Sequence, residues 1–233
     1  MSELVWDQVG EKLYEAGVDH CVLYLQNSSG AYPEGVAWNG ITSITESPSG
    51  ADEQKFYADN IVYGSIRGTE DFGATIEAFM YPDEWELCDG SASPVKGVHI
   101  GQQTRKPFGL SYRTLIGNDT DGLDHGYKIH LIYNATVSPS EKSRETINES
   151  PEMANPSWEM TTTPVPVSGK DANDKPYKPT AHLIITSTDF ETEAEKTKLN
   201  TLLAALYGTN GEGGSAGTTA YLPLPDAVID MLD

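Results

Sequence analysis

Apolar and polar residues alternate over short runs of this chain, and glycine, proline or polar clusters separate the runs. A period of two places successive side chains on opposite faces of an extended segment, and such runs between turn signals are typical of all-β proteins. The pattern predicts strands in residues 21–25, 36–45, 56–66, 73–80, 108–116, 127–137, 158–167 and 182–188.

Two of these strands have patterns that predict their place in a sheet. In residues 73–80 the even-numbered positions are all apolar, whereas the odd-numbered positions include Glu77. This strand is therefore expected to bury one face only. Residues 158–167 contain Pro164 and Pro166, which cannot donate a hydrogen bond to a neighbouring strand. This segment is therefore predicted to be an edge strand.

Helical patterns occur at two places. Residues 82–88 start with a proline followed by acids, which favour a helix N-terminus. Residues 192–207 place leucines on one stripe, and Gly208 follows at the expected C-cap. The predicted organisation is a main domain over residues 1–207, a flexible glycine-rich linker over 208–219 and a short apolar docking tail over 220–233.

The charge of the chain narrows the function classes. Its 233 residues include 15 basic and 35 acidic side chains, which gives a formal net charge of −20. Residues 1–90 hold 17 acids and 3 bases, whereas residues 91–135 hold 3 acids and 5 bases. Such acidity argues against binding to nucleic acid phosphates. It leaves open a merely solvated surface or two surfaces of opposite sign that meet in self-assembly.

No motif for catalysis, a cofactor or a metal is recognised. The five histidines lack the spacing of a zinc helix, and residues 119–124 depart from a calcium loop in the place of their glycine. No run of about 18 apolar residues predicts a membrane span, and no signal peptide is visible at the start. Cys21 and Cys88 are expected to be reduced, with a buried pair as the alternative. Trp38, Trp85 and Trp158 would suit a core, a subunit interface or a sugar-binding face.

Many segments in order resemble the major tail proteins of long-tailed siphophages and related prophages, over nearly the whole chain to about residue 207. The resemblance starts in residues 6–18 (WDQVGEKLYEAGV). It continues in residues 35–50 (GVAWNGITSITESPSG), 57–60, 72–90 (FGATIEAFMYPDEWELCDG), 101–118 (GQQTRKPFGLSYRTLIGN), 124–133 (DHGYKIHLIY), 139–151, 158–165 and 178–181.

This resemblance implies a β-sandwich or half-barrel with a flanking helix, from which six protomers form a ring. Stacked rings would form a hollow tail tube around the tape-measure protein, capped by tail terminator and by distal tail or baseplate proteins. DNA would later pass through the tube without specific binding. The protein would then be a structural part of the virion, assembled in the host cytoplasm, with no catalytic residue, cofactor or membrane partner.

The resemblance and the loop composition give candidate sites. Six copies of a −20 chain would give a ring of −120, and an acidic lumen wall would repel DNA phosphates. Glu46, Asp59 and Glu77, expected on strands, are the candidate lumen acids. Charge and loop length suggest ring-to-ring contacts at Ser47, Ser49, Asp52, Glu53, Arg105, Lys106, Arg113, Glu141, Lys142, Arg144 and Glu145.

Two other classes of function remain as alternatives. A monomeric acidic β-sandwich could bind carbohydrate or a host surface through exposed aromatic residues. A hydrolase could use a pair of carboxylates, although the sequence singles out no such pair. Mass in solution separates the first alternative from a tube protein, because a binding module would stay near 25 kDa.

Overall fold

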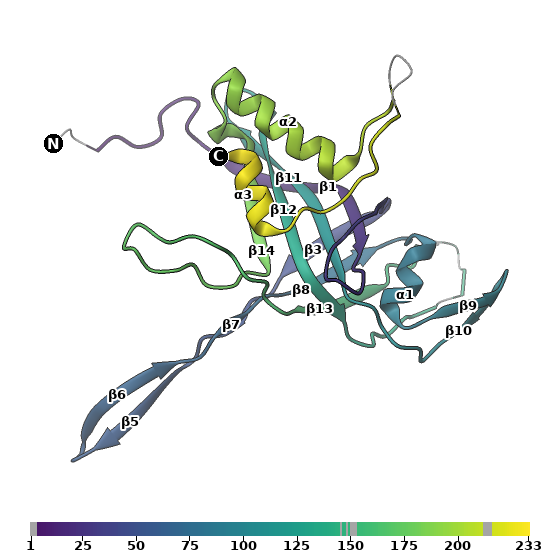
Figure 1. The fold of residues 1–233 in the computed structure, drawn as a ribbon, viewed down its shortest axis with the longest axis horizontal. Coiled ribbons are helices and arrows are strands. Elements are labelled where there is room, and N and C mark those ends of the chain that lie inside the picture. The colour runs from purple at the N-terminus through teal and green to yellow at the C-terminus, as the bar shows by residue number, and fades with distance from the viewer. Residues whose placement is uncertain (1–3, 145, 148, 150–152, 212–215) are drawn as a thin grey trace.

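The computed structural model describes residues 4–144, 146–147, 149, 153–211 and 216–233. An antiparallel sheet forms its centre, with the order β2-β1-β11-β12-β13-β8-β3, and β14 pairs with β12 beside β13 (Figure 1). The expected mainly β fold with a flanking helix is confirmed. The strands of this sheet are β1 (Tyr14–Leu25), β2 (Gly35–Ala37), β3 (Ile41–Glu46), β8 (Gly73–Ala78), β11 (Phe108–Asn118), β12 (Gly122–Val137), β13 (Ser157–Thr162) and β14 (His182–Thr186).

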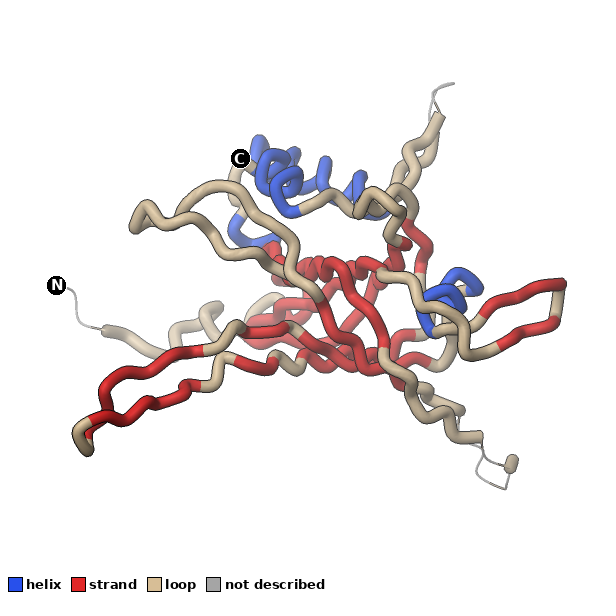
Figure 2. The backbone as a smooth tube through the Cα atoms, turned by 60° about the horizontal axis from the view of Figure 1, so that its bottom comes forward, coloured by secondary structure: helices blue, strands red, loops and turns tan. Residues whose placement is uncertain are grey.

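Smaller strand pairs extend from this sheet. Strands β4 (Ser49–Gly50) and β7 (Glu70–Asp71) pair with each other, as do β5 (Glu53–Ala58) and β6 (Ile61–Arg67). A third pair consists of β9 (Ala92–Val95) and β10 (Val98–Ile100). Figure 2 shows the β5–β6 and β9–β10 hairpins leaving the body in different directions.

Five helical segments occur in the described part of the chain, and the two longest cover one face of the sheet (Figure 2). The short ones are η1 (Asp83–Trp85), α1 (Glu86–Asp89) and η2 (Ser187–Asp189). Helix α2 (Glu193–Tyr207) begins at the predicted place, where Thr192 and Glu195 form a capping box. Helix α3 (Pro225–Leu232) lies against α2. Among the described residues, no helix has the length and apolarity needed to cross a membrane.

Two hydrophobic cores lie on opposite faces of the sheet. Leu131 and Tyr133 of β12 point toward α2 and α3, whereas Ile132 points to the other side. This alternation follows from the pleat of a strand buried on both faces. On the side of Ile132 the sheet curls, so that residues of β1, β8 and β11 meet in one core. The curled sheet matches the expected half-barrel.

The core on the side of Ile132 contains three tryptophans and both cysteines. Trp38, Trp85 and Trp158 are all buried there, with ring centroids 4.4 to 5.8 Å apart. Cys21 and Cys88 are buried in the same core as free thiols, and burial raises the pKa of Cys88 to about 12. These aromatic rings pack the interior and cannot form a sugar-binding surface.

The predicted edge strand is wrong. Strand β13 pairs with β12 on one side and with β8 on the other, so it lies inside the sheet. The strand ends at Thr162, before Pro164 and Pro166, which therefore do not interrupt either ladder. The alternation of 73–80 is confirmed, because Ala74, Ile76 and Ala78 of β8 are buried.

The C-terminal tail docks on its own chain. Leu222 and Val228 are buried against Tyr32 and the α2 leucines. The backbone of the tail bonds to the backbone of two other segments, residues 32–35 and α2, including Gly35 N–H to the Ala220 carbonyl at 2.8 Å. Residues 208–219 were predicted as a flexible linker. The two ends of this segment lie next to each other, because Thr209 and Thr218 form a β-bridge.

Candidate functional site

A group of exposed apolar side chains lies on a long projection that we call the arm, residues 47–72. It contains the β4–β7 and β5–β6 pairs and extends away from the sheet (Figure 1). Asp59 and Asn60 have φ values of 51° and 65°, which suit the two-residue turn of a hairpin. Its exposed large apolar side chains are Phe56, Tyr57, Ile61, Val62, Tyr63 and Ile66, between 48% and 78% exposed.

The three candidate lumen acids lie on three different surfaces. Asp59 is in the turn at the tip of the arm, so the prediction that it lies on a strand is wrong. Glu77 of β8 is on the face opposite the core, where it accepts hydrogen bonds from Ser43 and Asn155 at 3.1 Å. Glu46 pairs with Ala74, which faces the core, and therefore points to the inner side of the curled sheet.

The face that carries Glu77 is polar across three strands. Cross-strand partners share a face, and Ser43, Glu77 and Ser157 are aligned across β3, β8 and β13. The next row consists of Thr45, Thr75 and Glu159. Hydroxyl and carboxylate groups therefore cover this face, and no base occurs in either row.

The predicted contact residues divide between the arm and the body. Ser47, Ser49, Asp52 and Glu53 lie at the root of the arm rather than in one loop, since Ser49 and Glu53 belong to β4 and β5, and all four are exposed. Glu141 and Arg144 are exposed in a loop, and Lys106 is exposed before β11, whereas Arg105 is half-buried. Lys142 is held within its own chain, since it bonds to Asp89 at 2.8 Å and lies over the ring of Trp158. Glu145 lies outside the described residues.

Arg113 also has a partner in its own chain. Its guanidinium makes two hydrogen bonds of 2.7 Å to Asp19, the residue opposite it on β1. This bond, more than any other effect, lowers the pKa of the Asp19 carboxyl below its usual value. The pair therefore fastens β1 to β11, and sequence reasoning missed it because it depends on strand register.

The Asp19→Asn variant is expected to lose about 1 kcal/mol of unfolding free energy at pH 7, because a half-exposed charge-assisted contact is lost. A carboxyl whose pKa is lowered by folding stabilises the protein above its unfolded pKa, here 3.8. The difference between variant and wild type should therefore shrink as the pH falls below 3.8 toward the folded pKa. Urea unfolding at pH 7 and pH 3 measures it, and an equal loss at both values would contradict this assignment.

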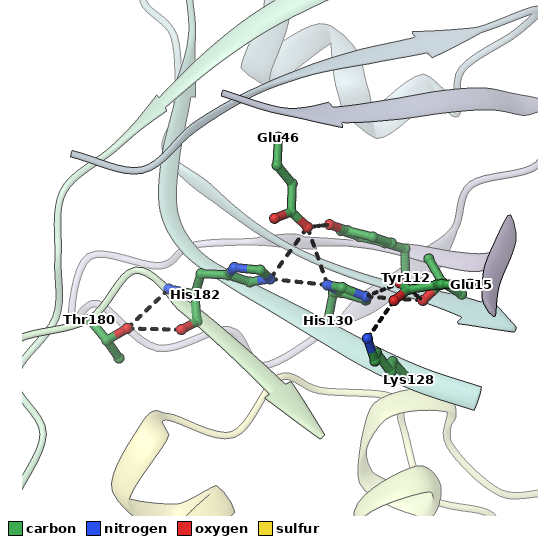
Figure 3. A network of polar contacts seen from close by, with 8 residues as sticks. Glu15, Glu46, Tyr112, Lys128, His130, Thr180 and His182 are labelled. Atoms are coloured by element: carbon green, nitrogen blue, oxygen red, sulfur yellow. Dashed lines mark hydrogen bonds and ion pairs between the residues drawn. The ribbon is translucent and has the colours of Figure 1, made fainter. Parts of the chain in front are cut away.

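A polar cluster lies on the inner side of the sheet, where Glu46 ends β3 (Figure 3). Its carboxylate atom Oε1 lies 3.3 Å from His130 Nδ1 and 3.9 Å from His182 Nε2. The two imidazole nitrogens are 3.2 Å apart. The hydroxyl of Tyr112 donates to the same Glu46 oxygen at 2.6 Å, and its ring stacks on His130.

Strand pairing brings these residues together. Tyr112 lies directly opposite His130 in the β11–β12 ladder. His182 lies opposite Ile132 in the β12–β14 ladder and so is the diagonal neighbour of His130 on the same face. Glu46 approaches from β3 because the sheet curls. Sequence spacing missed this cluster, since its two histidines are 52 residues apart.

A second set of contacts holds the far side of His130. Its Nε2 lies 3.2 Å from the Thr114 hydroxyl and 3.6 Å from a Glu15 carboxylate oxygen. Glu15 also bonds to Lys128 and accepts the Thr114 hydroxyl proton at 2.6 Å. The pKa of Glu15 is lowered, chiefly by Lys128 and Thr114 acting against partial burial. Glu15 is therefore a carboxylate at neutral pH.

Burial determines the charge of the two histidines. Their side chains are 6% and 13% exposed, respectively. Burial lowers the pKa of His130, opposed by the Glu46 and Glu15 carboxylates. Burial also lowers the pKa of His182 to about 4, opposed by Glu46 and reinforced by His130. Both imidazoles are neutral at pH 7, so the cluster presents nitrogen lone pairs and one carboxylate, which could hold a proton or a divalent cation.

A scan against models of known protein families found no match, and a search of curated proteins found no similar sequence.

Proposed function

We propose that this protein is a structural subunit that assembles with copies of itself into a hollow tube, as the major tail proteins of siphophages do. The proposal rests on the ordered sequence resemblance, and the observation that carries it is the arm. A two-stranded hairpin alone is marginally stable in water, and this one exposes apolar side chains on most of its length. An exposed apolar surface of this kind is typical of a site that binds another protein surface.

A second copy of the chain fits this partner. The outer strand edges of the arm offer unpaired backbone groups that can extend a neighbour's sheet. The arm, residues 47–72, carries 5 acids and 2 bases, whereas residues 91–135 carry 3 acids and 5 bases. Two of those bases, Arg113 and Lys128, are paired within the chain. Contact between copies would therefore use the exposed Lys96 and Lys106 against the acids of the arm.

The polar face of β3, β8 and β13 suits the wall of a channel for DNA. Glu77 and Glu159 would repel the phosphates of DNA. The serine and threonine residues beside them in the two rows carry no positive charge that could bind the DNA backbone. In this arrangement only Glu77 of the three candidate acids serves the lumen. Glu46 acts within its own chain, and Asp59 lies at the tip of the arm.

Negative-stain electron microscopy and light scattering of the untagged chain, over a concentration series, test the proposal. We expect rings or hollow tubes, and a scattering mass that rises with concentration. A tube that conducts DNA should also retain no duplex DNA at 0.15 M salt. A monomer near 25 kDa at every concentration, also after addition of a tail initiator complex and tape-measure protein, would contradict the proposal.

A further inference from the structure

We propose that Glu46, His130 and His182 form a binding site for one divalent metal ion, and that zinc is the ion that fits it best. The site goes beyond the tube function and does not depend on it. It joins the end of β3, where the arm begins, to β12 and β14.

The separations of the three donor atoms match a tetrahedral ion. Zinc binds imidazole nitrogen and carboxylate oxygen at about 2.0–2.2 Å, which places two ligands of a tetrahedron about 3.4 Å apart. The three separations here are 3.2, 3.3 and 3.9 Å. The ion therefore needs only small side-chain rotations, and the fourth position remains open for water.

Proton counting leaves one unfavourable contact in the cluster: His182 Nε2–H can donate to His130 Nδ1 at 3.2 Å, but the same Nδ1 lone pair also faces a carboxylate. A neutral His130 carries one proton, and both of its nitrogens face acceptors. With the proton on Nε2, the Nδ1 lone pair faces the Glu46 carboxylate at 3.3 Å. With the proton on Nδ1, the Nε2 lone pair faces Glu15 and a Thr114 hydroxyl whose own proton bonds to Glu15.

A cation between the three donors removes this conflict. It accepts the lone pairs of His130 Nδ1, His182 Nε2 and Glu46, and leaves His130 Nε2–H to donate to the Thr114 hydroxyl, with the Glu15 carboxylate 3.6 Å away. A carboxylate behind a ligating histidine fixes its tautomer and raises its basicity, as is usual for zinc ligands. Tyr112 likewise orients Glu46 through the 2.6 Å bond from its hydroxyl.

The donor set selects zinc over other common ions. Calcium and magnesium prefer six or more oxygen ligands, and this cluster offers two nitrogens and one carboxylate. An octahedral ion such as Fe²⁺ would bring neighbouring ligands to about 3.0 Å, closer than any separation found here. Bound zinc would hold the root of the arm against β12, because Glu46 is the last residue before the arm.

Equilibrium dialysis and calorimetry of the untagged full chain, stripped with chelator, test the site. We expect one zinc per chain, and melting raised by roughly 5–10 °C when free zinc is 100 times its Kd. Millimolar calcium should not raise the melting temperature. Cobalt(II), used as a probe, should give the intense visible bands of a tetrahedral site. Binding is measured on monomers as well as assemblies, so its failure and that of the tube proposal are separate results.

Variants locate the site. Glu46→Gln and His182→Gln should each weaken zinc binding by at least about 100-fold, since loss of an outer partner alone costs 10–100-fold. Tyr112→Phe should weaken it by about 10-fold. The matched control is His99→Gln, whose imidazole bonds to Ser93 and Glu86 outside the cluster, and it should bind as wild type.

Three outcomes overturn the proposal. They are zinc uptake no greater than that of His182→Gln, an octahedral cobalt spectrum, and loss of binding in the His99→Gln control. The wild-type cobalt spectrum keeps the test decisive even if a variant fails to fold.

Discussion

Replacing residues 48–71 with a short Asn-Gly-Gly turn is expected to abolish tube formation and to leave a folded monomer. The body should tolerate the change, because the arm starts and ends at neighbouring points of one ladder. Ser47 N–H bonds to the Gly73 carbonyl at 2.7 Å, and Glu46 pairs with Ala74. Phe72, which packs against the core, is kept in this variant.

The expected effect on assembly is large because the arm carries so much exposed apolar surface. Burial of one large apolar side chain contributes about 1.5–3 kcal/mol. Loss of only two such contacts per subunit would raise the critical concentration by 100-fold or more. Electron microscopy and light scattering measure the critical concentration, and circular dichroism checks the fold of the monomer.

A point variant gives the same test without a deletion. Tyr63→Lys places a charge on a side chain that is 78% exposed, and should raise the critical concentration by about 10-fold or more. Thr201→Lys adds the same charge on the exposed side of α2 and serves as the matched control. Normal tubes from the arm deletion would show that assembly uses another surface.

The Leu222→Ala variant is expected to lose about 3 kcal/mol of unfolding free energy, the second large effect. Leu222 is 2% exposed and fills the space between Tyr32 and the sheet, where Gly109 leaves no room for a further carbon. Removing a buried leucine side chain costs 2–5 kcal/mol, because the cavity does not collapse completely. Melting should fall by about 6–12 °C.

Leu224→Ala removes the same atoms two residues later and is the matched control. Its side chain is 43% exposed at the start of α3, so its loss should stay within about 1 kcal/mol. Urea unfolding compares the two variants. Equal losses would mean that the tail does not pack in solution as described here.

Local patterns predicted most of the elements because their causes are local. The capping box at Thr192, the left-handed Gly90 after α1 and the alternation in β8 are each determined by a few neighbouring residues. Where the prediction was wrong, a short-range signal was misread. Asp59 and Asn60 form a hairpin turn inside one predicted strand, and the prolines after β13 lie beyond its ladders.

The metal-binding cluster could not be predicted, because its geometry depends on pairings that are far apart in sequence. His130 and His182 meet only if β14 pairs with β12 in one register, and a shift by one residue would turn His182 to the other face. Glu46 joins them only because the sheet curls. Alternation places each residue on a face, but it does not determine which strands become neighbours.

Thr209 and Thr218 lie side by side, so the segment between them is a closed loop. The C-terminal tail after this loop binds its own domain as an intramolecular ligand would. The tail is held by Leu222, by Val228 and by backbone bonds, none of which needs the covalent connection between the two threonines. That connection supplies effective concentration, in the millimolar range for short linkers. A cut between the threonines would turn an intramolecular contact into a bimolecular one, and the protein into a pair of fragments that recognise each other.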